Sequence, residues 1–251
     1  QRAEAYDLVW ASEFARAERV ARAGLDSLSG QRFSGRSLID ARIIAAQLML
    51  RLGDATFYQD RKQEALGWYR RARDQIRFAI RRHGDMPRLL AALGETHWNV
   101  GSTIGDMPGG LTRALGEMNT AIPLLERVLS YGPDERADQL LSILLNQRGA
   151  YLLDLDRPRE ALADFERSLA MREAAARATP DNVTLRRAIA IQLHTLTETH
   201  LALGDVPAAC LAARRAISIW RAIERGGELT ALDRSDEYPE MRALHARACG
   251  V

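Results

Sequence analysis

Glu64-Ala-Leu-Gly-Trp-Tyr-Arg-Arg-Ala72 is the first of four related segments that decide the architecture of this chain. The others read Arg113-Ala-Leu-Gly-Glu-Met-Asn-Thr-Ala121, Glu160-Ala-Leu-Ala-Asp-Phe-Glu-Arg-Ser168 and Ala208-Ala-Cys-Leu-Ala-Ala-Arg-Arg-Ala216. The second residues of the segments lie 49, 47 and 48 residues apart, and they are Ala65, Ala114, Ala161 and Ala209. A fixed period of this size is typical of an array of stacked supersecondary units, whose function depends on the surface that the array presents.

The composition favours a protein with a substantial core and gives no sign of a polyanionic partner. Apolar residues make up 47% of the 251 residues, and the formal net charge is +2. No arm or face stands out as an unopposed basic surface, so nucleic acid is not an expected partner. No run of about 18 apolar residues occurs, so we expect no membrane span in this sequence. Because the sequence begins with Gln1, we expect it to be a piece of a longer protein.

Two residue types are notably rare. Of the 35 basic residues, only Lys62 is a lysine. The two cysteines, Cys210 and Cys249, lie near the C-terminus, which excludes a disulfide framework as the basis of the fold but allows one bridge. Neither cysteine lies in a Cys-x-x-Cys or Cys/His motif, so we interpret both as packed small hydrophobic residues rather than nucleophiles.

Glycine, proline and aspartate separate segments of helical periodicity, and no segment shows the alternation of a strand. We therefore predict an all-α chain with helices at about 3–28, 37–58, 61–83, 86–100, 111–129, 135–155, 158–178, 184–203, 206–223 and 238–249. The predicted organisation is an N-terminal capping helix at 1–30, repeat units at 36–84, 86–131, 134–179 and 181–226, and a C-terminal capping helix at 236–251.

A second motif precedes the marker alanines on the preceding helix. Leu52-Gly53, Arg148-Gly149 and Leu196-Thr197 each begin 13 residues before their alanine. In the second unit, Leu93-Gly94 begins 21 residues before its alanine, which predicts an eight-residue insertion and an inserted loop at 101–110. Small residues allow the partner helix to approach closely. An aromatic four residues after the alanine, such as Tyr69 or Phe165, would lie on the same face of its helix.

These features resemble the tetratricopeptide repeat over roughly residues 37–225. In that family a small residue on the first helix, an alanine opening the second helix and an aromatic one turn later form the helix–helix contact. The chain departs from the pattern where Arg148 replaces leucine, Thr197 replaces glycine, and Met118 and Ala213 replace the aromatic. The family's usual unit has 34 residues, and the unit here has 48. The resemblance implies a right-handed α-solenoid of antiparallel helix pairs.

Leu203-Gly-Asp-Val-Pro-Ala-Ala209 and Ala178-Thr-Pro-Asp-Asn182 resemble phrases in the long repeats of some bacterial serine/threonine protein kinases. Those repeats follow the kinase domain and a membrane helix. The resemblance implies a non-catalytic scaffold that binds a protein or peptide, in the extracytoplasmic sensory or interaction region of a signalling protein. Related arrays follow winged-helix domains in cytoplasmic bacterial regulators, which is the first alternative. The second is a small-molecule receptor with a pocket between the N-terminal helix and the groove.

The resemblance also implies that the first helix of each unit lines a concave groove. The side chains that this register places in the groove are Gln47, Asp54, Phe57, Tyr58, Arg88, Glu95, Trp98, Asn99, Asn146, Asp154, His194 and Glu198. The alternative for Phe57 and Trp98 is that they pack against the N-terminal helix. The Lys/Asn clamp with which some eukaryotic co-chaperone repeats hold a terminal carboxylate is absent from these positions.

Features that could indicate catalysis have ordinary structural explanations. The glycine-rich segment 101–110 lacks Gly-Lys-Ser/Thr and follows no strand, so it is interpreted as a loop rather than a phosphate site. His194 and Glu198 share a helix face, but His200 points elsewhere and a zinc site needs a third ligand. No acid/base pair or partnered nucleophile is evident, so we expect no enzyme activity, no cofactor and no metal.

The last helix is expected to cover the exposed face of the second helix of the fourth unit. This packing would bring Cys210 and Cys249 together, with Cα atoms within about 7 Å. In an extracytoplasmic compartment the two residues would then form a disulfide.

Overall fold

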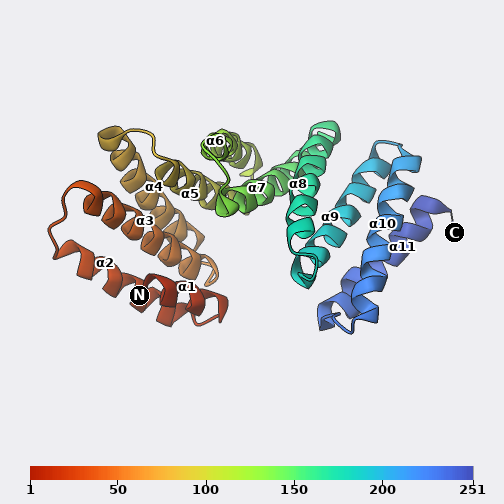
Figure 1. Cartoon of the computed structure of the whole chain (residues 1–251), viewed down its shortest axis with the longest axis horizontal. Coiled ribbons are helices and arrows are strands. Elements are labelled where there is room, and N and C mark those ends of the chain that lie inside the picture. The colour runs from red at the N-terminus through yellow and green to blue at the C-terminus, as the bar shows by residue number, and fades with distance from the viewer. Residues whose placement is uncertain (251) are drawn as a thin grey trace. The chain divides into compact units, whose positions relative to one another are not determined.

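The computed structural model describes residues 1–250, apart from the side chain of Trp10. All regular secondary structure in these residues is helical. The chain divides into an N-terminal body, Gln1–Ala137, and a C-terminal body, Asp138–Val251. Consecutive helices within each body pack side by side (Figure 1). The predicted all-α array of helix pairs is confirmed.

Six helices and the first residues of a seventh form the N-terminal body: α1 (Arg2–Trp10), α2 (Phe14–Ser29), α3 (Gly35–Phe57), α4 (Lys62–His83), α5 (Pro87–Gly105) and α6 (Leu111–Ser130). The C-terminal body holds most of α7 (Glu135–Asp154), then α8 (Pro158–Ala178), α9 (Val183–Ala202), α10 (Val206–Arg225), the π-helical turn η1 (Asp233–Glu237) and α11 (Tyr238–Cys249). In addition to these sequential contacts, α1 touches α3, and α3 touches α5. The first helices of successive pairs therefore lie next to one another in the N-terminal body.

The N-terminal segment is a helix pair, so the predicted single capping helix is wrong. Helix α1 ends before Ser12, whose φ of +60° turns the chain into α2. Ala5 and Ala17 are fully buried, and they lie 48 residues before Gly53 and Ala65. The first two helices thus form another pair in the same register. Sequence reasoning missed this pair because α1 is short and alanines are frequent throughout the segment.

A left-handed residue marks the turn inside each of five helix pairs. The residues are Ser12, Asp60, Gly109, Asp156 and Gly204, with φ values of +60°, +60°, +67°, +56° and +77°. They follow one another after 48, 49, 47 and 48 residues, which matches the spacing of the marker alanines. Glycine and short polar residues tolerate this conformation better than other residues. The backbone therefore repeats five times, with one extra residue before α6.

The second repeat unit has a different register from the predicted one. A Cβ on Gly53 would lie 2.1 Å from the Tyr69 ring, and one on Gly149 would lie 2.5 Å from the Phe165 ring. The matching residue is Gly101, where a Cβ would lie 2.8 Å from Met118. Gly53, Gly101 and Gly149 are each 48 residues apart.

The predicted eight-residue insertion and the loop at 101–110 are therefore wrong. Helix α5 continues through Gly101 to Gly105, so the inserted residues extend the helix rather than form a loop. Gly94 packs elsewhere, since a Cβ there would meet Leu125 at 3.0 Å. The sequence alone offered two apolar–glycine pairs on one helix, and only the contact with the partner helix distinguishes them.

The C-terminal helix is held to its neighbours by polar and aromatic contacts. The backbone N–H of Thr230 donates to Asp233, and the Asp233 N–H donates to the Thr230 hydroxyl, at 2.7 and 3.1 Å. The Arg187 guanidinium from α9 binds the same carboxylate at 2.8 Å. Tyr238 stacks on the buried Trp220 ring of α10, with centroids 6.0 Å apart. These contacts fix α11 against α9 and α10.

Candidate functional site

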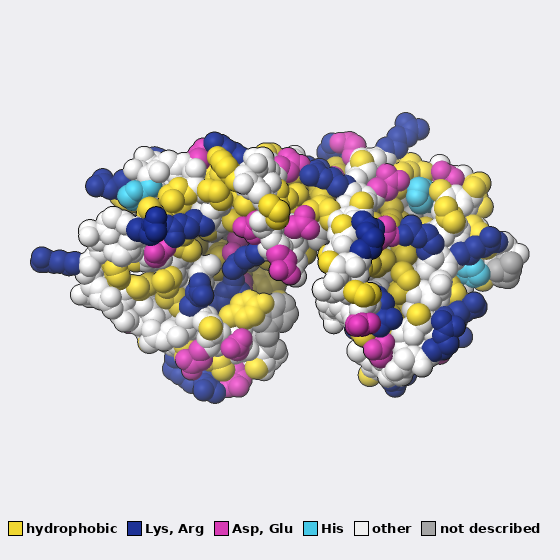
Figure 2. All heavy atoms as spheres, in the orientation of Figure 1, with side chains coloured by type: hydrophobic (Ala, Val, Ile, Leu, Met, Phe, Trp, Pro, Cys, Tyr) yellow, Lys and Arg dark blue, Asp and Glu magenta, His cyan; other side chains and the backbone are white. Residues whose placement is uncertain are grey.

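A chain of ion pairs crosses the first helices of the N-terminal body. The Arg51 guanidinium binds the Asp54 carboxylate at 2.7 Å and the Glu95 carboxylate of α5 at 3.2 Å. The second oxygen of Glu95 accepts from Arg136, at the start of α7, at 2.7 Å. We call Asp54, Arg51, Glu95 and Arg136 the polar floor. Basic and acidic side chains gather over α3 and α5 on the face drawn in Figure 2.

The inner members of the polar floor are largely shielded from water. The side chains of Arg51, Asp54 and Glu95 are 12%, 14% and 10% exposed. Burial raises the pKa of Asp54, although the Arg51 charge and a hydrogen bond from Tyr69 act in the opposite direction. The Tyr69 hydroxyl donates to Asp54 at 2.9 Å, and burial together with the Asp54 carboxylate raises the pKa of Tyr69 well above 10. The floor is therefore a fixed hydrogen-bonded arrangement.

Helix α1 contributes to the same surface. The Tyr6 ring, which is 46% exposed, lies 5.1 Å from the Arg51 guanidinium carbon, and such contacts are attractive when partly desolvated. The Gln47 carbonyl accepts a hydrogen bond from Arg2 at 2.7 Å. The first helix pair therefore adds an aromatic edge to the polar floor.

Three aromatic rings form a ledge at the turn between α3 and α4. Tyr58 is 56% exposed and stacks on Phe14 of α2, with centroids 5.5 Å apart and planes 17° apart. Phe57 meets Tyr58 edge-on at 5.5 Å and packs against the core formed by α3, α4 and α5. The contact with the N-terminal segment is therefore made by Tyr58, not by Phe57, and it leaves Tyr58 accessible.

The other predicted groove residues of the N-terminal body have less accessible polar groups. Arg88 pairs with Asp40 of α3. The Asn99 amide donates to the carbonyl of Glu95, one turn back on its own helix, at 2.9 Å. Trp98 is half-buried. In the corrected register, the α5 residues that match Gln47, Asp54, Phe57 and Tyr58 are Glu95, Ser102, Gly105 and Asp106.

Four predicted groove residues belong to the C-terminal body. Asn146 and His194 are half-buried, whereas Asp154 and Glu198 are exposed. The His194 Nε2 lies 3.8 Å from a Glu198 carboxylate oxygen, one turn away on α9. The structure places these four residues on α7 and α9, apart from the polar floor of the N-terminal body.

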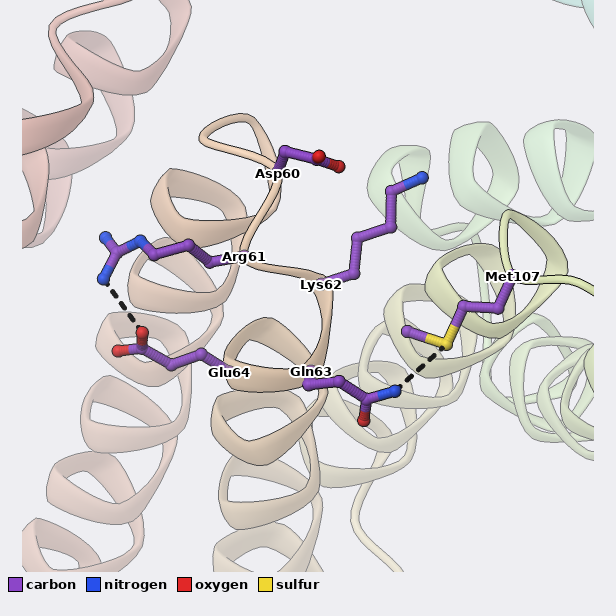
Figure 3. A pocket seen from close by; sticks show the side chains of 6 residues that line it. All are labelled: Asp60, Arg61, Lys62, Gln63, Glu64 and Met107. Atoms are coloured by element: carbon purple, nitrogen blue, oxygen red, sulfur yellow. Dashed lines mark hydrogen bonds and ion pairs between the residues drawn. The ribbon is translucent and has the colours of Figure 1, made fainter.

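A surface pocket of about 420 Å³ lies beside the ledge, and the groove prediction did not include it. Its lining residues are Asp60, Arg61, Lys62, Gln63, Glu64 and Met107 (Figure 3). Arg61 is paired with Glu64 at 2.9 Å and with Glu18 of α2 at 2.6 Å. The Gln63 amide donates to the Met107 sulfur at 3.8 Å. The sequence signal was the single lysine of the chain, Lys62.

A buried ionisable cluster joins α4, α5 and α6, and sequence reasoning missed it as well. His97, 3% exposed, contacts the Glu117 carboxylate through Nδ1 at 2.5 Å. Arg73 binds the same carboxylate at 3.1 Å. Burial alone would raise the pKa of Glu117, but the hydrogen bonds and charges of His97 and Arg73 outweigh it and lower the pKa. The cluster pairs its charges inside the helix packing, which indicates a structural role.

In the C-terminal body, Cys210 of α10 and Cys249 of α11 form a disulfide, with Cα atoms 4.9 Å apart. The described residues include no group of three His, Cys, Asp or Glu side chains that could hold a metal ion. Within the same residues, no helix combines the length and the apolar character that crossing a membrane requires.

Comparison with known proteins supports the repeat architecture. Residues 144–176 match the sequence model of the tetratricopeptide repeat. Among curated proteins, none matches the chain in sequence. The solved structure of BtubC (BKLC) from P. vanneervenii is similar, with a TM-score of 0.62 and 15% identity over 94% of this chain and 84% of that one.

Two further solved structures show weaker similarity. The Rap conjugation gene regulator of plasmid pLS20, in complex with the Phr* peptide, has a TM-score of 0.48 and 13% identity over 98% of this chain and 73% of that one. A thermophilic tetratricopeptide repeat protein of Thermus thermophilus has a TM-score of 0.31 and 18% identity over 93% and 100% of the two chains. With five helix pairs in one register and a matching family segment, this chain is a tetratricopeptide repeat array.

Proposed function

We propose that the chain is a non-catalytic scaffold that binds a protein or peptide segment along α1, α3 and α5. The observation that carries this proposal is the polar floor beside two exposed aromatic residues, Tyr6 and Tyr58. Aromatic side chains are enriched at protein interfaces because they bury a large area with few rotatable bonds. Repeat arrays commonly use such extended surfaces for binding.

The pairing of the charges supports binding rather than catalysis. Arg51 is bound to two carboxylates, and Glu95 is bound to two guanidinium groups. A general base or a nucleophile needs an unoccupied group within reach of a substrate. The inner floor residues instead hold one another in place, which suits a rigid surface with little entropy to lose on binding.

We further infer that the scaffold belongs to a larger bacterial signalling protein, such as a membrane-anchored serine/threonine kinase, and faces an extracytoplasmic compartment. The repeat phrases near residues 178–182 and 203–209 support the parent class. The Cys210–Cys249 disulfide supports the compartment, because disulfides persist in oxidising environments. In a cytoplasmic winged-helix regulator the two thiols would remain reduced. Labelling of intact cells with a thiol-reactive maleimide, before and after reduction, separates these locations.

The binding proposal is tested with a displayed library of random peptides selected on the purified chain. We expect Tyr6→Ala and Tyr58→Ala to weaken the selected peptides by more than about 1 kcal/mol each, as interface aromatics do. Arg82→Ala is the control, because Arg82 is exposed on α4. Circular dichroism establishes that each variant is folded. Peptides that bind the folded tyrosine variants as tightly as the parent chain would disprove this site.

A further inference from the structure

The pocket beside the ledge contains a cation that is not neutralised by a neighbour. In the part of the chain that the structure describes, Lys62 has no ion-pair partner, and its ammonium lies 5.8 Å from the centroid of the Phe57 ring. The adjacent Arg61 is already bound to Glu18 and Glu64. In Figure 3, the Lys62 side chain points away from the Arg61–Glu64 pair. Lys62 is therefore the cation in this pocket that is available to a ligand.

An apolar surface adjoins this cation. Phe14, Tyr58 and Phe57 follow one another at centroid distances of 5.5 Å, and Phe57 leads to Lys62. Met107 closes the pocket on the side of the α5–α6 turn. We call Phe14, Tyr58, Phe57, Lys62 and Met107 the Lys62 ledge. Its dimensions suit several residues of an extended segment, at about 3.3 Å per residue.

We propose that the Lys62 ledge binds an extended segment of a partner protein in which an acidic side chain is flanked by apolar ones. The carboxylate would meet the Lys62 ammonium, and a neighbouring apolar side chain would pack on Tyr58 and Phe57. This inference rests on the proposed function, because the ledge and the polar floor are contiguous: Asp54 and Tyr58 lie one turn apart at the end of α3.

Charge complementarity decides the class of segment. An acidic side chain gains a charge-assisted hydrogen bond at Lys62, whereas a basic one would meet a like charge there. Asp60 also lines the pocket, and it would repel an acidic ligand. The two residues therefore make opposite predictions for the same peptide. This opposition separates specific recognition by Lys62 from general stickiness of the aromatic rings.

The test uses the full chain and an array of synthetic decapeptides. Each peptide carries a central glutamate flanked by combinations of leucine, tryptophan and proline, and matched peptides carry glutamine or lysine instead. Affinities of the best peptides are then measured by fluorescence anisotropy with Lys62→Gln, Lys62→Arg and Asp60→Asn. We expect Lys62→Gln to weaken the glutamate peptides about tenfold or more, as loss of a charge-assisted hydrogen bond does. Lys62→Arg keeps the charge and should retain most of the affinity, and Asp60→Asn should bind equally or more tightly.

The single lysine provides an independent readout. A carbodiimide couples amines to carboxylates, so in this chain it can join a bound glutamate peptide only through Lys62 or the N-terminal amine. We expect a cross-link at Lys62 that disappears in the Lys62→Arg variant. Glutamate and glutamine peptides that bind equally, or binding that changes with Tyr58→Ala but not with Lys62→Gln, would overturn this inference alone. Binding of no peptide at all would overturn the proposed function together with it.

Discussion

Gln192 on α9 gives the sharpest test of the packing described above. It is 2% exposed, and neither its Nε2 nor its Oε1 has a hydrogen-bond partner in the described residues. The residues 48 and 144 positions earlier, Leu144 and Leu48, are leucines that are 0% and 2% exposed. Gln192 therefore occupies a position that is apolar in two other pairs. A buried amide without a partner costs roughly 1–3 kcal/mol.

Replacing Gln192 with leucine should remove that cost, because leucine has a similar volume and no polar atom. We expect the free energy of unfolding to rise by about 1–3 kcal/mol, which corresponds to roughly 2–4 °C in Tm per kcal/mol for a chain of this size. Urea denaturation followed by circular dichroism measures the change.

The matched control is Gln139→Leu, an exposed glutamine on α7 of the same body. It should change the free energy of unfolding by no more than about 0.5 kcal/mol, as exposed substitutions usually do. If Gln192→Leu leaves the stability unchanged or lowers it, the amide is hydrogen-bonded in the folded protein, and the reasoning from the repeat register fails at this position.

Three further predictions concern the register, the disulfide and the buried carboxylate. Gly53→Ala should cost about 1–3 kcal/mol through overpacking, and more than Gly94→Ala, in urea denaturation, because its new Cβ would lie 2.1 Å from a ring rather than 3.0 Å from a flexible side chain. Equal costs would contradict the corrected register. Replacing both Cys210 and Cys249 with serine should lower the stability by about 4 kcal/mol in the chain-entropy model for a loop of about 40 residues. An unchanged midpoint would mean that the bridge does not form. Glu117 has a lowered pKa in the folded chain, so its charge contributes stability that is fully present above its ordinary value of 4.5 and is lost as the pH falls through the folded pKa. Glu117→Gln should therefore destabilise the chain at pH 7 and have a smaller effect near pH 3, and a penalty that does not vary with pH would exclude this role.

The repeat could be predicted from the sequence because the marker alanines lie where only a small side chain fits. Ala65, Ala114, Ala161 and Ala209 are all fully buried. The first pair was missed because alanine on a short helix has several explanations and carries no spacing information by itself. The second unit was misaligned because Leu93-Gly94 and Val100-Gly101 are equivalent as text. Only the distance between Gly101 and Met118 shows which glycine faces the second helix.

The site could be predicted only in part, for a related reason. Asp54 and Glu95 were identified as groove residues, but the group that connects them, Arg51, was not. Its partner lies 44 residues away on another helix, and the sequence does not give the distance between those helices. The pocket at Lys62 was missed because Met107, which closes it, comes from a turn that was assigned to an inserted loop.

The glycine contacts and the ion pairs obey different rules along the chain, and this difference bears on how such an array can change. Gly53, Gly101 and Gly149 recur every 48 residues, so removing or duplicating one whole period would preserve the close approach of the helices. The bridge between Arg51 and Glu95 does not recur, since Asn99 and Ile143 occupy the corresponding positions one period later. Units could be exchanged without loss of the backbone fit, but the charges would no longer meet their partners. The order of the units is thus encoded in their side-chain charges, not in the shape of the helices.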